Sequence, residues 1–214
     1  MLIEPRKHPH QQRSAATVDA ILEAAARILE RKGLDALTTN AVAELAGVSI
    51  GSLYQYFPGK AAILAELIRR ERLVLLAGID RIAHAPGDSL KDDVCSLIRT
   101  AVAHQLLRPA LARALEYGEA TLPLGSETAK LTHELVRYMA TLLERHGVSK
   151  VMEAAQDLVA LAKGMIDAAG IAGESDQRLL VDRVCRAALG YLQYPVFMPD
   201  DNYRGCPDDS EHSV

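Results

Sequence analysis

"VSIGSLYQYF", residues 48–57, contains three of the nine aromatic residues of the chain within four positions. Two of them, Tyr54 and Tyr56, are one residue apart in a stretch of mostly small residues. A strand would place both tyrosines on the same face, whereas a helix would place them about 200° apart. The two structures therefore predict different surfaces.

The apolar residues of this stretch favour the helix. Ile50, Leu53 and Phe57 lie at positions i, i+3 and i+7, which is the spacing of one buried helical face. Ser49 precedes them and is a good N-cap residue. We therefore predict a helix from about Ile50 to Phe57 that leaves Gly51, Ser52, Tyr54 and Gln55 facing outwards.

A second short helix precedes this one. Its sequence, "TTNAVAELAG", follows a possible N-cap at Thr38 and stops at Gly47, since glycine commonly ends helices. The two helices are joined by "AGVS", residues 46–49. Two short helices connected in this way indicate a helix-turn-helix, in which the second helix is the candidate recognition element.

Helical periodicity continues along the chain, and we find no convincing strand and no internal repeat. The fold class is predicted to be all-α, with about nine helices. The expected domains are an N-terminal arm and helix-turn-helix unit at 1–60, a helical body at 61–195 and a disordered acidic tail at 196–214. Besides the two short helices, the expected helices begin at Thr17 and near Lys60 and then cover 89–106, 109–120, 126–146, 150–170 and 176–194.

The distribution of charged and apolar residues limits the functions that the chain can have. The chain has 214 residues and a net charge of −4, but residues 1–60 carry seven Lys or Arg against six Asp or Glu. The first fourteen residues form a short basic arm, with Arg6, Lys7 and Arg13 against one acid, Glu4. A basic arm on a mildly acidic body is compatible with DNA contact at that end, although so short a charged run is also typical of a solvated tail. No apolar run is long enough to span a membrane and no secretion signal is evident, so we expect a cytoplasmic protein.

Residues 37–64, "LTTNAVAELAGVSIGSLYQYFPGKAAIL", resemble the DNA-binding region of the TetR family of bacterial regulators. One departure is Gly59, where the family often has Asn, Ser or Asp, and glycine caps a helix almost as well. The resemblance implies a dimer that binds DNA, with a small-molecule pocket in the body. The matching residues are Thr38, Thr39, Val42, Ala43, Ala46, Gly47, Val48, Ser49, Gly51, Ser52, Leu53, Tyr54, Tyr56, Phe57, Lys60 and Ile63.

The DNA contacts can be argued from residue types as well. Thr39 and Ser49 lie at helix N-termini, which favour phosphate, and Gly51 permits close approach of the backbone. Gln55 can pair with adenine and Tyr54 can contact a thymine methyl group. The alternatives are that Tyr54 only covers the core, that Gln55 is a solvated residue and that Ser49 is only a cap. The candidate DNA-binding residues are Arg13, Thr38, Thr39, Ser49, Gly51, Ser52, Tyr54, Gln55, Tyr56 and Lys60.

The last two helices are apolar over much of their surface, which indicates partners on more than one side. We expect a homodimer, and two recognition helices related by a two-fold axis predict a palindromic operator. A fully intramolecular core is the alternative. The candidate dimer residues are Val151, Ala155, Leu158, Ala162, Met165, Val184, Ala188 and Tyr191.

The ligand site is less clearly marked. Polar residues around the break at Pro109 are candidates for a pocket edge, although each is also compatible with an ordinary structural role. The candidate ligand-binding residues are His104, Arg108, Glu116, Tyr117, Tyr138 and Met165. We expect no cofactor and no metal, since the three cysteines lack metal-ligand spacing and no metal-ligand helix pair occurs.

The sequence thus predicts a ligand-responsive repressor that binds double-stranded DNA and is released by a small-molecule effector. The alternative is a DNA-organising protein of the same fold whose body binds a protein. No catalytic residue is predicted, because neither a phosphate loop nor a nucleophile elbow is present.

Overall fold

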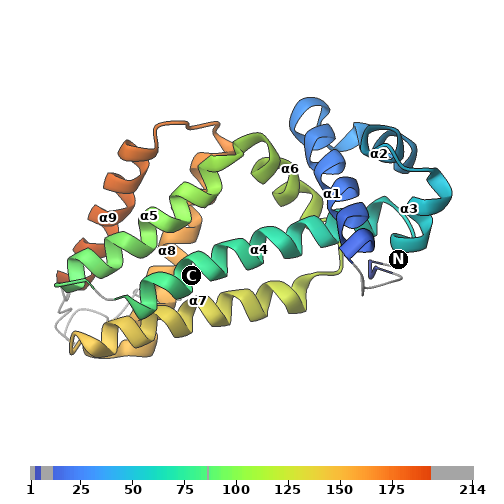
Figure 1. Cartoon of the computed structure of the whole chain (residues 1–214). Coiled ribbons are helices and arrows are strands. Elements are labelled where there is room, and N and C mark those ends of the chain that lie inside the picture. The colour runs from blue at the N-terminus through green and yellow to red at the C-terminus, as the bar shows by residue number, and fades with distance from the viewer. Residues whose placement is uncertain (1–2, 6–11, 86, 194–214) are drawn as a thin grey trace, which may run out of the picture.

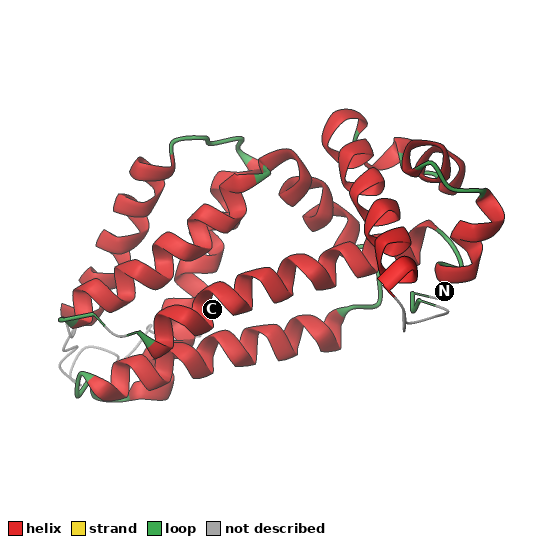
Figure 2. Cartoon of the chain, in the orientation of Figure 1, coloured by secondary structure: helices red, strands yellow, loops and turns green. Residues whose placement is uncertain are grey.

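The computed structural model describes residues 3–5, 12–85 and 87–193. Within these ranges the chain is all-α, as predicted, with nine α-helices and one 3₁₀ turn, Leu34–Ala36, and no strand (Figure 2). The predicted tail at 196–214 lies outside the described residues, as does the side chain of Arg13. The helices are α1 Gln12–Lys32, α2 Thr39–Ala46, α3 Ile50–Tyr56, α4 Lys60–His84, α5 Leu90–Leu107, α6 Pro109–Glu119, α7 Gly125–Arg145, α8 Val151–Ile171 and α9 Gln177–Gln193.

Helices α1, α2 and α3 form one end of the molecule (Figure 1). Leu53 and Phe57 are fully buried in their shared core, as the sequence predicted. The prediction for Ile50 was wrong, since 40% of its surface is exposed. Only Leu53 in this seven-residue helix is buried, so the first turn of α3 lies beyond the reach of the core.

Helix α4 connects this end to the body (Figure 1). Its first half, including Ile63 and Ile68, belongs to the core shared with α1, whereas Ile79 belongs to a second core. Helix α6 packs on α1 and α4, and Gly118 allows very close packing there, because an added Cβ would lie 2.7 Å from a methyl carbon of Leu64. The first core therefore extends beyond residue 60, and the predicted division into 1–60 and 61–195 stays a prediction.

The second core is formed by α5, α7, α8, α9 and the end of α4. One buried carboxylate, Asp93, accepts hydrogen bonds from the Gly87 amide at 2.5 Å and pairs with His146 Nε2 at 2.7 Å. These contacts connect the loop before α5 to the end of α7. Among the described helices, none is both long and apolar enough to cross a membrane.

Candidate DNA-binding surface and ligand cavity

The helix-turn-helix is closed by side-chain caps at both of its helices. The hydroxyl of Thr38 accepts from the Ala41 amide at 3.2 Å, and that of Ser49 accepts from the Ser52 amide at 3.0 Å. Gly47 ends α2 with φ +67°, a left-handed conformation that glycine adopts without strain. The capping role predicted for Thr38 and Ser49 is thus confirmed.

The predicted DNA-contact residues on α3 remain accessible. Tyr54 is 40% exposed and its hydroxyl lies 3.2 Å from that of Thr39, at the start of α2. Gln55 is exposed, whereas Tyr56 is half-buried and packs partly on the first core. The arrangement therefore joins the N-terminus of α2 to the outer face of α3.

Gly51 has no packing reason to be glycine. A Cβ added there would meet no atom closer than the Ser49 hydroxyl oxygen, at 3.9 Å. Gly51 is exposed, and so is Lys60, the first residue of α4. Next to Gly51, the Ser49 and Ser52 hydroxyls are 2.8 Å apart. Packing within the chain therefore does not require glycine at position 51. Close approach of a binding partner to the backbone of α3 would require it.

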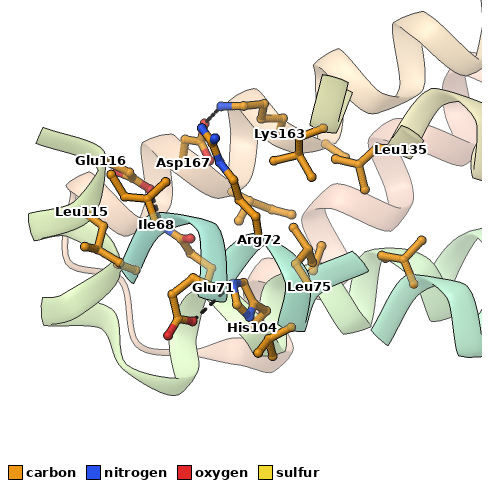
Figure 3. Close-up of a pocket in the computed structure, with 18 of the residues that line it drawn as sticks. Ile68, Glu71, Arg72, Leu75, His104, Leu115, Glu116, Leu135, Lys163 and Asp167 are labelled. Atoms are coloured by element: carbon orange, nitrogen blue, oxygen red, sulfur yellow. Dashed lines mark hydrogen bonds and ion pairs between the residues drawn. The ribbon is translucent and has the colours of Figure 1, made fainter. Parts of the chain in front are cut away.

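A cavity of about 470 Å³ lies in the body between α4, α5, α6, α7 and α8 (Figure 3). Most of its wall is apolar, and the exposed residues Val74 and Leu107 line its rim. The apolar wall includes Ile68, Leu75, Ile79, Ile98, Leu111, Leu115, Leu131, Leu135, Met139, Val159 and Ile166, and the polar wall is formed by Glu71, Arg72, His104, Gln105, Arg108, Glu116, Glu119, Thr128, Lys163 and Asp167.

Most charges in the wall are paired within the chain. Arg72 Nη2 lies 2.7 Å from both a Glu119 carboxylate oxygen and the Thr128 hydroxyl. Lys163 pairs with Asp167 on the next turn of α8. In each pair the positive and negative charges balance.

Two carboxylates of the wall, Glu71 and Glu116, have no such cationic partner among the described residues; Glu71 lies 3.8 Å from the His104 imidazole. The Oε1 atom of Glu116 accepts from the Gln105 amide at 2.6 Å, but its Oε2 is buried without a hydrogen-bond partner among the residues that the structure describes. Burial raises the pKa of the Glu116 carboxyl, and the nearby Asp167 raises it further. Arg72 Nη1 is a second buried atom of this wall for which the described residues provide no hydrogen-bond partner.

His104 faces the same cavity from α5. Burial lowers the pKa of its imidazole, and Glu71, with an oxygen 3.8 Å from Nε2, opposes this effect only in part. The ring is therefore held in its neutral form near pH 7.

Three of the six residues predicted to bind a ligand line this cavity. His104, Arg108 and Glu116 line the cavity, but Tyr117, Tyr138 and Met165 do not. Tyr117 is exposed on the outer side of α6, and the Tyr138 hydroxyl donates to Asp80 at 2.7 Å. Met165 packs on the second core.

Sequence reasoning missed the other seven polar residues of the wall, which are Glu71, Arg72, Gln105, Glu119, Thr128, Lys163 and Asp167. The available signal was on α4, where Glu71 interrupts the apolar face that contains Ile68 and Leu75. A charge within such a face indicates either a buried ion pair or a polar site.

The structure places the eight predicted dimer residues in different environments. Ala155, Leu158, Val184 and Ala188 are already buried within this chain, because α8 and α9 pack against α5, α7 and each other. These four side chains therefore belong to the internal core. Val151, Ala162 and Met165 are half-buried, and exposed Tyr191 donates to Asp157 at 2.6 Å.

A different face of α8 is left uncovered. Ala160, Gly164, Ala168 and Ile171 recur every three or four residues and are all exposed. Leu179 at the start of α9 is also 49% exposed. We call Ala160, Gly164 and Ala168 the small-residue stripe, which ends at the larger Ile171.

One ion pair connects the cavity wall to α1. Arg108, in the junction between α5 and α6, binds Glu30 of α1 through two hydrogen bonds of 2.6 and 2.9 Å and lies 3.3 Å from Glu23. Hydrogen bonding to Arg108 lowers the pKa of Glu30. The cavity is therefore connected to the helix that supports α2.

Comparison with known proteins gives two family matches. Residues 21–67 match the model for bacterial regulatory proteins of the tetR family, and residues 89–192 match the tetracyclin repressor-like C-terminal domain. The chain is 30% identical over 155 residues to the nucleoid occlusion factor SlmA of Alteromonas mediterranea, covering 68% of this chain and 76% of that protein.

The transcriptional repressor KstR of Mycolicibacterium smegmatis is 36% identical over 104 residues, which cover 47% of this chain and 51% of KstR. The chain thus spans about half the length of its KstR relatives. Two solved structures share the fold. The fatty acid degradation regulator FadR of Bacillus halodurans has 18% identity and a TM-score of 0.67, covering 84% of this chain and 97% of that chain.

The second structure, SmeT in complex with triclosan, has 20% identity and a TM-score of 0.62, covering 90% of this chain and all of that chain. The helix-turn-helix with its accessible recognition helix, the nine-helix fold of the described residues and the family matches agree. The chain belongs to the TetR family of bacterial helix-turn-helix regulators, whose members are DNA-binding transcription regulators and not enzymes.

Proposed function

We propose that the protein is a repressor that binds a palindromic operator as a homodimer in the cytoplasm and is released when a small molecule enters the cavity. The observation that carries the proposal is that α4 and α6 each contact both the cavity and the core beneath the recognition helix. Ile68, Leu111 and Leu115 line the cavity and belong to that core.

The DNA-binding part of the proposal uses the accessible residues of α3. Gly51 and Gln55 are open to a partner, and the Thr39 to Tyr54 contact orients the tyrosine at the start of α2. Lys60 would supply a charge to the phosphates, and Tyr54 and Gln55 would reach base edges in the major groove.

The release step uses the connection between the two ends. A ligand that moves α6 would move Arg108 and, through Glu30, helix α1. Release requires that the ligand bind more tightly to the conformation with low DNA affinity. The relative SmeT was solved with triclosan, which supports a small-molecule effector for a protein of this fold.

We propose the small-residue stripe, with Leu179, as the dimer surface. Exposed small residues allow two helices to approach closely, and an isologous contact of this kind would relate two recognition helices by a two-fold axis.

A second candidate function is a DNA-organising protein whose body binds another protein. The similarity to SlmA, a nucleoid occlusion factor, favours it, since that match covers more of this chain than the KstR match does. Genome-wide binding separates the two functions. Many dispersed sites would favour the organising protein, whereas one or two promoter sites would favour the repressor.

Footprinting on the DNA upstream of the protein's own gene is the direct test. We expect one protected palindrome, with protection lost on adding an effector from a metabolite screen. Protection that is unchanged across a broad screen would contradict release by a ligand and leave DNA binding standing.

A further inference from the structure

We propose that the cavity takes an apolar molecule carrying one protonated amine, and that Glu116 is the residue that binds this amine. The inference rests on the proposed function only in treating the cavity as an effector site. It concerns the chemical class of the ligand, which can be tested without DNA.

The first argument is the charge around Glu116. The charged side chains with the strongest influence on it are Asp167, Lys163 and Glu119, which are two acids and one base. The base already pairs with Asp167, and Glu119 already pairs with Arg72. Glu116 is therefore a carboxylate without a cationic partner among the described residues.

The second argument is the unpartnered oxygen. Within the described part of the chain, Glu116 Oε2 is buried and receives no hydrogen bond, while Oε1 accepts from the neutral amide of Gln105. An ammonium group in the cavity would supply both the missing charge and the missing donor. Because Oε2 is closed off from water, contact requires the side chain to rotate, and the cost of leaving the oxygen unpaired favours that rotation.

The third argument excludes an anionic ligand. Arg72 has a buried donor without a partner among the described residues, at Nη1, but its charge is balanced by Glu119 at 2.7 Å, and the charge of Lys163 is balanced by Asp167. The donor therefore suits an uncharged acceptor such as a carbonyl oxygen. A carboxylate ligand would also have to lie near Glu116, Asp167 and Glu71, which face the same cavity.

The rest of the cavity wall indicates the chemical character of the rest of the ligand. Apolar side chains dominate the 470 Å³ cavity, and its rim carries the exposed residues Val74 and Leu107. Such a surface favours a hydrocarbon body over a polar one. His104 is held neutral by burial, so it does not add a positive charge that would repel an amine.

Titration calorimetry at pH 7.5 with three molecules of equal chain length tests the proposal: octylammonium, 1-octanol and octanoate. We expect the full-length protein to bind octylammonium about tenfold more tightly than either of the others, as one charged hydrogen bond supplies. Glu116→Gln should remove most of this preference and leave octanol binding nearly unchanged.

Glu144→Gln, an exposed glutamate on α7 outside the cavity, is the matched control and should behave like the unmodified protein. Tighter binding of octanoate, or an ammonium preference that survives in a folded Glu116→Gln variant, would overturn the proposal. Octylammonium binding that depends on Glu116 but leaves DNA affinity unchanged would support this inference and count against effector-driven release.

Discussion

Gly51 lies in the first turn of α3, with open space where a side chain would begin. Gly51→Ala should therefore stabilise the fold by about 0.5 to 1 kcal/mol, because alanine loses less backbone entropy in a helix. If the backbone of α3 approaches DNA closely, the added methyl group should nevertheless weaken operator binding by about tenfold. Denaturant unfolding and fluorescence anisotropy with operator DNA measure the two effects.

Gly125→Ala, at the exposed start of α7 with no atom within 4 Å of the added carbon, is the control. It should leave DNA binding unchanged. Normal DNA affinity in Gly51→Ala would show that this glycine does not serve close approach to DNA.

Glu116 gives a prediction about stability and pH. Its folded pKa is raised above its ordinary value near 4.5, so the folded state holds more protons and the free energy of unfolding falls as the pH rises through that interval. Glu116→Gln removes this penalty. We expect the variant to be more stable by about 1 kcal/mol at pH 8, because glutamine has no charge to desolvate, and no more stable at pH 4, where the carboxyl is protonated.

Thermal unfolding across this pH range is the measurement. A stability gain that is equal at both pH values would mean that a packing change, and not the carboxylate charge, explains the result.

At the scale of elements, the ion pair of Arg108 with Glu30 joins the junction of α5 and α6 to α1. The pKa of Glu30 is lowered, so its contribution to stability is present above about pH 4.5 and is lost as the pH falls through the folded pKa. Because both side chains are about a third exposed or less, Glu30→Gln should cost about 1 kcal/mol at pH 7. The difference should shrink as the pH approaches 3.

Glu23→Gln is the matched comparison on the same helix. Glu23 lies farther from Arg108, at 3.3 Å, and is 47% exposed. Denaturant unfolding of both variants at pH 7 should show the larger loss for Glu30→Gln, and equal losses would contradict the assigned geometry.

The helices themselves could be predicted from the sequence because each depends on local pattern and caps. Thr38 and Ser49 cap α2 and α3 as expected. Where the pattern was short, it failed. The helix predicted at 150–170 begins one residue later, at Val151, because Lys150 adopts a left-handed conformation with φ 50°. The exposure of Ile50 likewise depends on how far the first core reaches, which no local pattern encodes.

At the scale of the whole molecule, the cavity could not be predicted in the same way. Its polar wall combines Arg72 from α4, Gln105 from α5, Glu116 from α6 and Lys163 from α8. Periodicity tells which face of each helix is apolar, but not how the helices cross, so it cannot tell which charges meet. Four of the predicted dimer residues are buried within the chain for a related reason, since an apolar face can be covered by the same chain or by a second copy.

A substitution in the small-residue stripe tests whether the protein dimerises through this surface. Gly164 is exposed at its centre, and Gly164→Glu would place a carboxylate in a closely packed interface, while glutamate is a better helix former than glycine and should not unfold α8. We expect the unmodified protein to have twice the 23.2 kDa chain mass at micromolar concentration and the variant to have the single mass.

The variant should also lose about 100-fold in operator affinity, because each half-site would then be bound separately. Light scattering and anisotropy measure the two quantities, and Ala129→Glu, exposed on α7, should leave both unchanged. A monomeric unmodified protein would rule out the dimer. A Gly164→Glu variant that is still dimeric would move the interface elsewhere, since a buried pair of like charges at this position would not be tolerated.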